Sequence, residues 1–182
     1  MKFPKPYADL AQRGRVASGL VLAVSFFWLA KPTVGRLIVG AVISTGGLLL
    51  RAWAAGHLAK NERLATSGPY AWVRNPLYLG SAIAAAGLAF AGREWLMAMV
   101  FALVFVLIYL PAIQLEEEHL GKLFSGYGRY ASRVPFLLPR PPQEPREARF
   151  SFSRYIRNQE YKALAAWLVA LVWLWWRLPQ GR

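Results

Sequence analysis

The sequence alternates uncharged apolar blocks with short joints that are rich in Lys, Arg and Pro. The blocks occupy residues 16–30, 37–50 (continuing past Arg51 to 59), 77–92, 95–115 and 163–176. A membrane-spanning helix needs about 20 apolar residues, and flanking Lys or Arg side chains can lengthen a shorter block by reaching the interface. Backbone groups inside a membrane must bond within their own helix. We therefore expect an all-α fold, a multi-span transmembrane helix bundle of about five spans with cytoplasmic interfacial helices.

The basic residues are unequally divided between alternate joints. With five spans, one side holds 16 of the 22 Lys and Arg: four before the first span, three at 60, 63 and 74, and nine in 116–162. The other side holds five, and Arg51 lies within a span. Cytoplasmic loops carry the excess of positive charge. The bias predicts a multi-pass integral membrane protein, in the inner membrane if the source is bacterial, with its N-terminus and both polar segments cytoplasmic.

Charge and composition narrow the class of partner. The net charge is +13, and the basic residues adjoin apolar blocks, where they would meet anionic lipid head groups. Nucleic-acid binding instead needs a basic face on a soluble fold. Cys is absent, which excludes disulfides and thiolate chemistry, and two histidines, His57 and His119, are too few for a dedicated metal site. We expect lipid partners, and neither nucleic acid nor a bound metal.

The length of 182 residues suits a single domain. Five of the twelve prolines fall in 135–149, which predicts a linker without regular structure, and an extra C-terminal span follows at about 163–176. The segment between them mixes aromatic and basic residues, as at a membrane interface. Small residues in the second and third blocks predict close packing of those helices: Gly40, Ser44 and Gly47 with Gly80, Ser81, Ala84, Ala85, Ala86 and Gly87.

A polar motif, GPYAWVRNPLYLG, precedes the third block at residues 68–80. Asn is a favoured N-cap and Pro a favoured first helical residue, so Asn75 and Pro76 predict the start of a helix, with Arg74 just outside it. The free N–H groups of that helix would form an anion site at the cytoplasmic interface. The simpler alternative is a well-capped helix whose Arg74 touches lipid phosphate.

A second polar motif follows the fourth block. Pro111 should kink that helix and leave the carbonyl of Leu107 without its usual donor. Three glutamates follow at 116–118, and Gln114 shares a helical face with Glu117. An amphipathic continuation is predicted from the spacing of Leu120, Leu123, Phe124, Tyr127 and Tyr130. The alternative is an acidic cap that only balances nearby basic residues.

Arg51 is a charge within an apolar block, and such a charge usually has a partner. Glu116 or Glu117 is the expected partner. His57 and Asn61 lie one turn apart and would share a face if the second helix continues that far.

The two motifs, in this order and at this spacing, resemble the isoprenylcysteine carboxyl methyltransferase family, and phospholipid methyltransferases share the pattern. The resemblance covers about residues 40–139. It implies that both motifs face the cytoplasm and together bind S-adenosyl-L-methionine. The candidate cofactor-binding residues, with His57 and Asn61 included, are His57, Asn61, Gly68, Tyr70, Arg74, Asn75, Pro76, Tyr78, Gly80, Gln114, Glu116 and Glu117.

Two departures from the family pattern matter. Arg74-Asn75-Pro76 stands where Arg-His-Pro is common, and Asn cannot accept a proton at neutral pH. Phe124-Ser125 replaces Phe-Gly, and the spacing leaves open which two of the glutamates 116–118 match the family's pair. Arg74, Asn75 and Glu117 are the candidate catalytic residues, with no general base at position 75.

The resemblance implies S-adenosylmethionine-dependent methyl transfer to a lipidic or membrane-associated acceptor that enters from the bilayer. Glutamates would accept hydrogen bonds from the cofactor, Arg74 and the helix N-terminus would hold its carboxylate, and Tyr70, Tyr78 or Trp72 would face its sulfonium. A carboxylate, an amine and a thiol remain open as acceptors. The alternatives are an NADPH-dependent membrane sterol or enone reductase and a non-enzymatic basic membrane protein.

Overall fold

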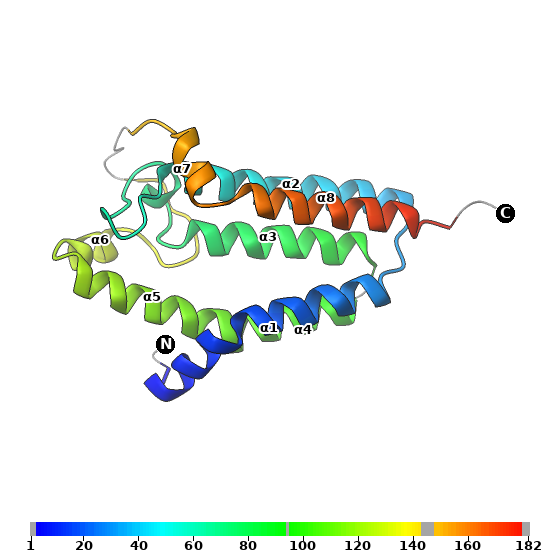
Figure 1. The fold of residues 1–182 in the computed structure, drawn as a ribbon, viewed down its shortest axis with the longest axis horizontal. Helices are drawn as coiled ribbons and strands as arrows, with labels where there is room; N and C mark the ends of the chain where they lie inside the picture. The colour runs from blue at the N-terminus through cyan, green and yellow to red at the C-terminus, as the bar shows by residue number, and fades with distance from the viewer. Residues whose placement is uncertain (1–2, 94, 143–147, 180–182) are drawn as a thin grey trace.

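The computed structural model describes residues 3–93, 95–142 and 148–179 as an elongated helical bundle (Figure 1). Within these residues every regular element is helical, which confirms the all-α prediction. In chain order the elements are α1 (Lys5–Leu29), α2 (Val34–His57), the 3-10 turn η1 (Gly68–Ala71), α3 (Pro76–Ala91), α4 (Trp95–Val104), the π-helical η2 (Phe105–Tyr109), α5 (Leu110–Leu123), α6 (Tyr127–Arg133), α7 (Phe152–Arg157) and α8 (Tyr161–Trp176).

Each apolar block forms a helix, but the helix ends differ from the block ends. α1 begins at Lys5, well before the apolar block, because Pro6 fits the first helical turn and the charged residues after it are no obstacle to a helix. Two helical stretches of the described chain, Val34–His57 and Trp95–Leu123, are long and apolar enough to cross a membrane. α3 and α8, with 16 residues each, are shorter. The number of five spans therefore stays a prediction.

α2 and α3 pack closely along their small residues, as predicted. A Cβ added to Gly47 would lie 2.5 Å from the carbonyl oxygen of Gly80, and one added to Gly87 would lie 2.5 Å from the backbone N of Ser44. Backbones at this distance leave no room for a side chain. The glycines of both helices therefore serve to bring the two axes together.

The fourth block bends where Pro111 predicts it. The π-helical stretch η2 precedes Pro111 and joins α4 to α5 without a break. The hydroxyl of Tyr7 donates a hydrogen bond of 2.6 Å to the carbonyl of Leu107, the group that Pro111 leaves without a helical donor. The N-terminal part of α1 thus supplies a hydrogen-bond donor to the Leu107 carbonyl.

The apolar surface of the bundle is largely external. Its small interior cluster contains Ala30, Leu37, Ala91 and Leu174. Large apolar side chains that are more than half exposed include Leu20, Val24, Trp28, Val42, Leu49, Leu103, Val172 and Trp175. Soluble proteins rarely expose contiguous apolar surface on this scale, so a lipid environment fits the bundle.

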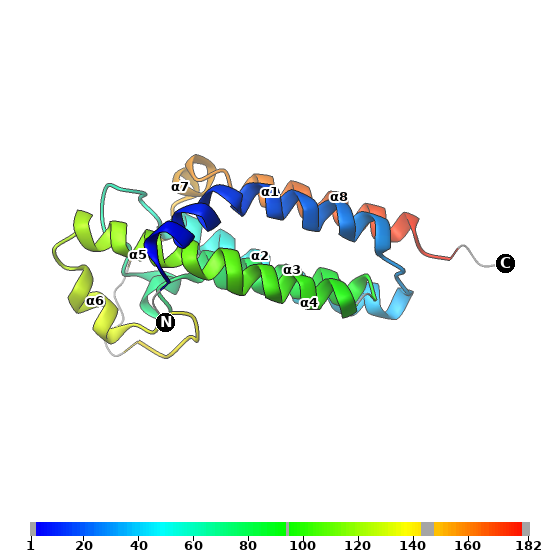
Figure 2. The same cartoon turned by 90° about the horizontal axis from the view of Figure 1, so that it is seen from below.

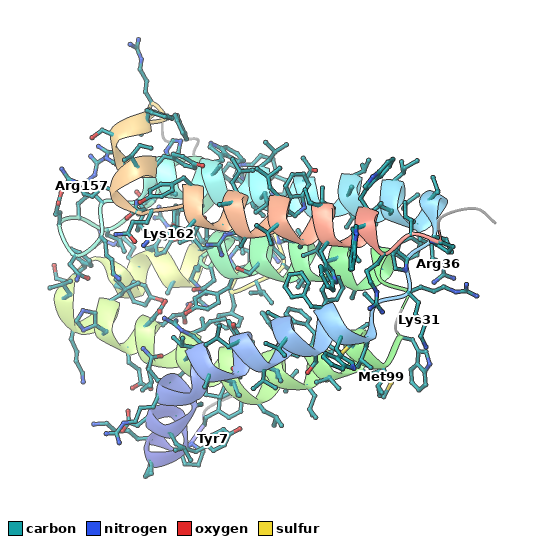
Figure 3. All side chains as sticks on the ribbon, turned by 45° about the vertical axis from the view of Figure 1, so that its right-hand side comes forward. Tyr7, Lys31, Arg36, Met99, Arg157 and Lys162 are labelled. Carbon is teal, nitrogen blue, oxygen red and sulfur yellow. The ribbon has the colours of Figure 1, made fainter. Side chains whose placement is uncertain are left out.

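The polar connections gather at one end of the bundle. Figure 2 shows α6, α7 and the loops that precede α3 on the same side, with the C-terminal end of α8 at the other. Arg157 lies at the polar end, whereas Lys31 and Arg36 lie at the opposite end (Figure 3). This arrangement agrees with the division of basic residues between the two ends, while the orientation in a membrane stays a prediction.

One segment prediction needs correction, and another is confirmed for the described residues. The amphipathic continuation after the glutamates is not one helix, because α5 ends at Leu123 and α6 begins at Tyr127. The described parts of the 135–149 linker have no regular structure, as expected, while 143–147 lie outside the described residues.

Candidate functional site: a charged cavity at the polar end

The start of α3 and the acidic run of α5 converge. Asn75 and Pro76 occupy the N-cap and first helical positions, as predicted. The Asn75 side chain makes no capping bond, however, and its amide nitrogen donates to Glu117 Oε1 at 3.0 Å and to the carbonyl of Phe136 at 3.1 Å. Arg74 Nη1 lies 3.2 Å from Glu117 Oε2. Capping was therefore the wrong role for this side chain, because the carboxylate of Glu117 takes its amide.

Glu116 has different partners from Glu117. Its Oε1 accepts hydrogen bonds from the Tyr78 hydroxyl at 2.8 Å and from Arg15 Nη1 at 3.1 Å. Arg15 also donates to the Tyr78 hydroxyl at 2.7 Å. Arg15 comes from α1, so three helices contribute to this cluster. Sequence reasoning treated Arg15 only as a flanking charge and missed it.

The third glutamate and Gln114 face elsewhere. Gln114 Nε2 donates to Glu118 Oε1 at 2.9 Å, and its amide oxygen accepts from the backbone N of Phe3 at 2.7 Å. Gln114 and Glu117 therefore have separate partners, although they lie on neighbouring positions of one helix. The structure places Glu116 and Glu117, rather than Glu118, beside the first motif.

A cavity of about 790 Å³ lies between these elements. Its walls come from α1, the end of α2, the chain from 58 to 65, η1, the start of α3, η2, α5, α6 and the start of α8. Seven of the predicted cofactor-binding residues line it: Asn61, Tyr70, Arg74, Asn75, Pro76, Tyr78 and Glu116. Five others are absent from its lining: His57, Gly68, Gly80, Gln114 and Glu117.

Some of the residues outside the lining have structural contacts. Gly68 has a φ of 58°, and a Cβ there would lie 2.7 Å from the buried ring of His57. His57 is the last residue of α2, so the helix does not continue to Asn61, which has a φ of 60° in the following turn. The expected shared face of His57 and Asn61 is therefore wrong. Gly80 packs against α2.

Arg51 is paired with a residue that the sequence did not indicate. Its Nη2 lies 2.7 Å from Glu160 Oε1 and its Nε lies 3.0 Å from Glu160 Oε2, a two-point contact with the residue that precedes α8. Arg51 also donates to Ser81 and to the carbonyl of Leu77. The predicted pairing with Glu116 or Glu117 is wrong, because those carboxylates are held by other partners. Arg51 and Glu160 both line the cavity.

Three tyrosines form the wall near α6: Tyr70 and Tyr127 are buried, and Tyr130 is partly buried. The Tyr130 hydroxyl donates to the carbonyl of Tyr70 at 2.8 Å. Burial raises the pKa of Tyr70, Tyr127 and Tyr130 well above the ordinary value of 10.0, with a neighbouring tyrosine adding to the shift for Tyr70 and Tyr130 and Glu117 for Tyr127. These phenols are neutral at physiological pH. They can donate hydrogen bonds but cannot serve as bases there.

Two buried polar atoms at the cavity have no hydrogen-bond partner among the described residues. They are Nε of Arg74 and the hydroxyl of Tyr127. Both residues line the cavity and flank Glu117. Buried polar groups are nearly always paired with protein, water or a ligand, so these two atoms mark a place where a ligand would complete the hydrogen bonding.

The fold and the site define an α-helical protein with a cavity, lined in part by charged residues, at the polar end of an apolar bundle. The chain belongs to the phospholipid methyltransferase family, whose model matches residues 15–126. The match includes both polar motifs and Arg15, and it ends before α6, so Tyr127, Tyr130 and Glu160 lie outside it.

Several curated proteins are similar to the chain. A cobalt-zinc-cadmium resistance protein of Cupriavidus metallidurans is 32% identical over 129 residues, which cover 70% of this chain and 53% of that protein. A protein-S-isoprenylcysteine O-methyltransferase of Schizosaccharomyces pombe is 28% identical over 115 residues, covering 60% and 49%. The chain thus spans about half the length of these relatives. No solved structure matches it. Within the described residues, no group of three His, Asp or Glu is placed to hold a metal ion.

Proposed function

We propose that the chain is an S-adenosyl-L-methionine-dependent methyltransferase that acts on a lipidic or membrane-associated acceptor. The observation that carries the proposal is the convergence of Arg74 and Asn75 with Glu117 beside the cavity, with Glu116 and Tyr78 in its wall. Membership of the phospholipid methyltransferase family and similarity to isoprenylcysteine methyltransferases support it.

The residues present fit the cofactor. The unpaired Nε of Arg74 and the free N–H groups at the start of α3 are donors suited to its carboxylate. Glu116 offers carboxylate oxygens to the hydroxyl or amino groups of the cofactor, which would replace the hydrogen bond from Arg15. The rings of Tyr70 and Tyr78 offer π faces to a cation. When bound, the cofactor supplies an electrophilic methyl group.

Glu117 is proposed to position rather than to touch the methyl donor. It holds Arg74 with one oxygen and Asn75 with the other, and it lies outside the cavity lining. A charge-assisted contact of this kind fixes a guanidinium more firmly than a neutral bond does. Methyl transfer gains most of its rate from orienting the two reactants in a dry pocket. Holding Arg74 and Asn75 in place therefore contributes to catalysis.

Position 75 supplies no base. Asn75 uses its amide as a donor to Glu117 and Phe136, and an amide cannot accept a proton at neutral pH. The neutral tyrosines of the wall are likewise unable to accept one. An acceptor that is already ionised, such as a carboxylate, suits this site better than an ammonium, which must first lose a proton.

The cavity extends from the polar end into the apolar part of the bundle. Val16 and Gly19 of α1, Leu77 and Ser81 of α3 and Tyr109 of η2 line its deeper part. An acceptor with a hydrocarbon portion matches such a lining, because apolar surface would be buried on both sides. This supports a lipidic acceptor over a small soluble one.

A binding assay followed by turnover tests the proposal. The purified full-length protein should bind S-adenosylhomocysteine, measured by calorimetry, and transfer radiolabelled methyl from S-adenosylmethionine to an extracted membrane lipid fraction. NADPH should not bind. Binding of NADPH in place of S-adenosylhomocysteine would favour a reductase. A protein that binds neither, in detergent and in lipid, would be a non-enzymatic membrane protein.

A further inference from the structure

Arg15 links α1 to two other walls of the cavity. Its Nη1 donates to the hydroxyl of Tyr78 on α3 at 2.7 Å and to Glu116 Oε1 on α5 at 3.1 Å. Both of these hydrogen bonds come from the same nitrogen. Among the described residues, Nε and Nη2 of Arg15 have no hydrogen-bond partner. The guanidinium therefore has donors left for a ligand in the cavity that it lines.

The pair of Arg15 with Glu116 is weakly held. The two side chains keep 34% and 44% of their surface exposed. An ion pair as exposed as this contributes little to stability, because solvent screens its charges. Arg51, which also lines the cavity, is held at two points by Glu160, a side chain that is only 9% exposed. Of these two arginines, Arg15 can change its partner at the smaller cost.

Arg15 stands at the border between the charged and the apolar parts of the cavity. Val16 follows it, and Gly19, one helical turn later, shares its face of α1; both line the deeper apolar part. The hydroxyl of Tyr109 lies 3.6 Å from the place of a Cβ on Gly19, and it makes no hydrogen bond with the described residues. Arg15 and Tyr109 thus offer two donors beside an apolar lining. A ligand with an anionic head and a hydrocarbon chain matches this border.

The cofactor and Arg15 would compete for the same carboxylate. In the proposed function, on which this inference rests, the hydroxyl or amino groups of the cofactor replace Arg15 as partners of Glu116. The released guanidinium then faces the apolar part of the cavity without a counter-charge, which is unfavourable unless another anion pairs with it. The planar fork of a guanidinium can donate two parallel hydrogen bonds to a carboxylate.

We propose that Arg15 passes from Glu116 to the carboxylate of an amphiphilic acceptor when the cofactor occupies Glu116. Each ligand then favours the binding of the other, because the cofactor frees the cation that the acceptor needs. Such coupling is reciprocal, so both affinities change by the same factor. Arg15 selects the acceptor in this proposal, and the cofactor sets when it can do so.

The test measures binding rather than turnover. Full-length protein in a sugar-based detergent is titrated with carboxyl-labelled octanoate and with labelled octanol, followed by carbon-13 NMR, and empty micelles give the background. S-adenosylhomocysteine should tighten octanoate binding at least fivefold and leave octanol binding unchanged. In calorimetry, saturating octanoate should tighten S-adenosylhomocysteine binding by the same factor.

Variants of the pair give opposite results. Arg15→Gln should weaken octanoate binding in the presence of S-adenosylhomocysteine about tenfold, the effect of removing one charged hydrogen bond, and should abolish the coupling. Arg15→Lys, which keeps the charge but loses the fork, should bind octanoate with intermediate affinity. Glu116→Gln should bind octanoate several-fold more tightly than the unaltered protein when no cofactor analogue is present, because its Arg15 is already released. Arg13→Gln is the matched control, since Arg13 is exposed on the same helix and lies outside the cavity lining.

The outcomes are decisive for Arg15 and separable from the methyltransferase proposal. The inference is overturned if Glu116→Gln fails to strengthen octanoate binding, if Arg15→Gln keeps the preference for octanoate over octanol, or if Arg13→Gln weakens binding equally. S-adenosylhomocysteine that binds without any coupling to octanoate also overturns it, and leaves methyl transfer intact. If S-adenosylhomocysteine does not bind the unaltered protein, the proposed function fails, and the two Gln variants without it decide whether Arg15 holds the carboxylate.

Discussion

Asn75 and Glu117 are 42 positions apart in the sequence, and a hydrogen bond of 3.0 Å joins the amide of one to the carboxylate of the other. The bond links the two polar motifs directly. Because Glu117 also holds Arg74, a single side chain fixes both residues that precede Pro76. The relationship gives the first two predictions.

Replacing Glu117 with Gln should reduce S-adenosylhomocysteine binding at least tenfold. The substitution removes the negative charge that holds the Arg74 guanidinium, and charged hydrogen bonds contribute about 1.5–3 kcal/mol each. Calorimetric titration measures the loss. Glu118→Gln is the control, since Glu118 is exposed and contacts Gln114 on the other side of α5. Equal binding by both variants would contradict a positioning role for Glu117.

Replacing Asn75 tests whether this position has a chemical role. Asn75→Ala removes the hydrogen bond to Glu117, so it should weaken binding of S-adenosylhomocysteine. It should leave the shape of the pH–rate profile unchanged. Asn75→His should add no ionisation to that profile, because Asn75 is held as a donor and not as a base. Steady-state rates against pH give the answer. A new limb in the profile of the His variant would show that this position reaches the reacting atoms.

Breaking the pair between Arg51 and Glu160 should destabilise the protein. Glu160→Gln leaves a guanidinium uncompensated, and losing one partner of a buried pair costs about 3 kcal/mol. The double variant Arg51→Met with Glu160→Leu should recover most of the loss. The matched control is the exposed pair of Arg157 with Glu62, whose removal should cost less than about 1 kcal/mol. Unfolding titrations in mixed micelles compare the four proteins, and similar losses for both pairs would contradict the prediction.

The contact between α2 and α3 should tolerate no side chain at position 47. Gly47→Ala places a Cβ 2.5 Å from backbone atoms of α3, and overpacking of this kind costs about 1–3 kcal/mol. Gly46→Ala is the matched control, because nothing lies within 4 Å of a Cβ at position 46. That variant should be stabilised by about 0.5–1 kcal/mol, since Ala is the better helix former. The same unfolding assay measures both changes.

Alkaline pH should loosen the tyrosine wall. Burial raises the pKa of Tyr130 above its ordinary value of 10.0, so the folded protein binds the phenolic proton more tightly than the unfolded chain does. The resulting stability is complete below about pH 10 and is lost as the pH rises through the raised pKa of the folded state. Tyr130→Phe should remove this part of the loss of stability at alkaline pH, and it should also lose the hydrogen bond to Tyr70. Thermal unfolding measured at a series of pH values checks the prediction.

The sequence predicted local features of this fold better than its long-range contacts. The start of α3 at Pro76, the bend at Pro111 and the glycine contact of α2 with α3 follow from rules that act over a few residues. The convergence of the two motifs came from their resemblance to a known family. The spacing of the motifs alone does not predict this convergence, because the convergence depends on how far each helix is rotated about its own axis.

The partners that sequence reasoning missed join segments about a hundred positions apart. Tyr7 reaches Leu107, Arg15 reaches Glu116, and Arg51 reaches Glu160. For Arg51, the sequence favours the glutamates at 116–118 as partners, because they are nearer to it in the sequence than Glu160. In the structure these three glutamates are bound by other groups. One clue was present in the sequence: Glu160 is the only acidic residue after position 147 and stands at the head of the last apolar block.

The pairing of Arg51 with Glu160 also constrains how the chain can diverge. The family model ends at residue 126, so the arginine lies inside the matched segment and its carboxylate lies beyond that segment. A homologue that lacked α8 would carry an orphan cation in its apolar interior. Position 51 and the C-terminal helix are therefore expected to be inherited together, with an uncharged residue at 51 wherever the helix is missing.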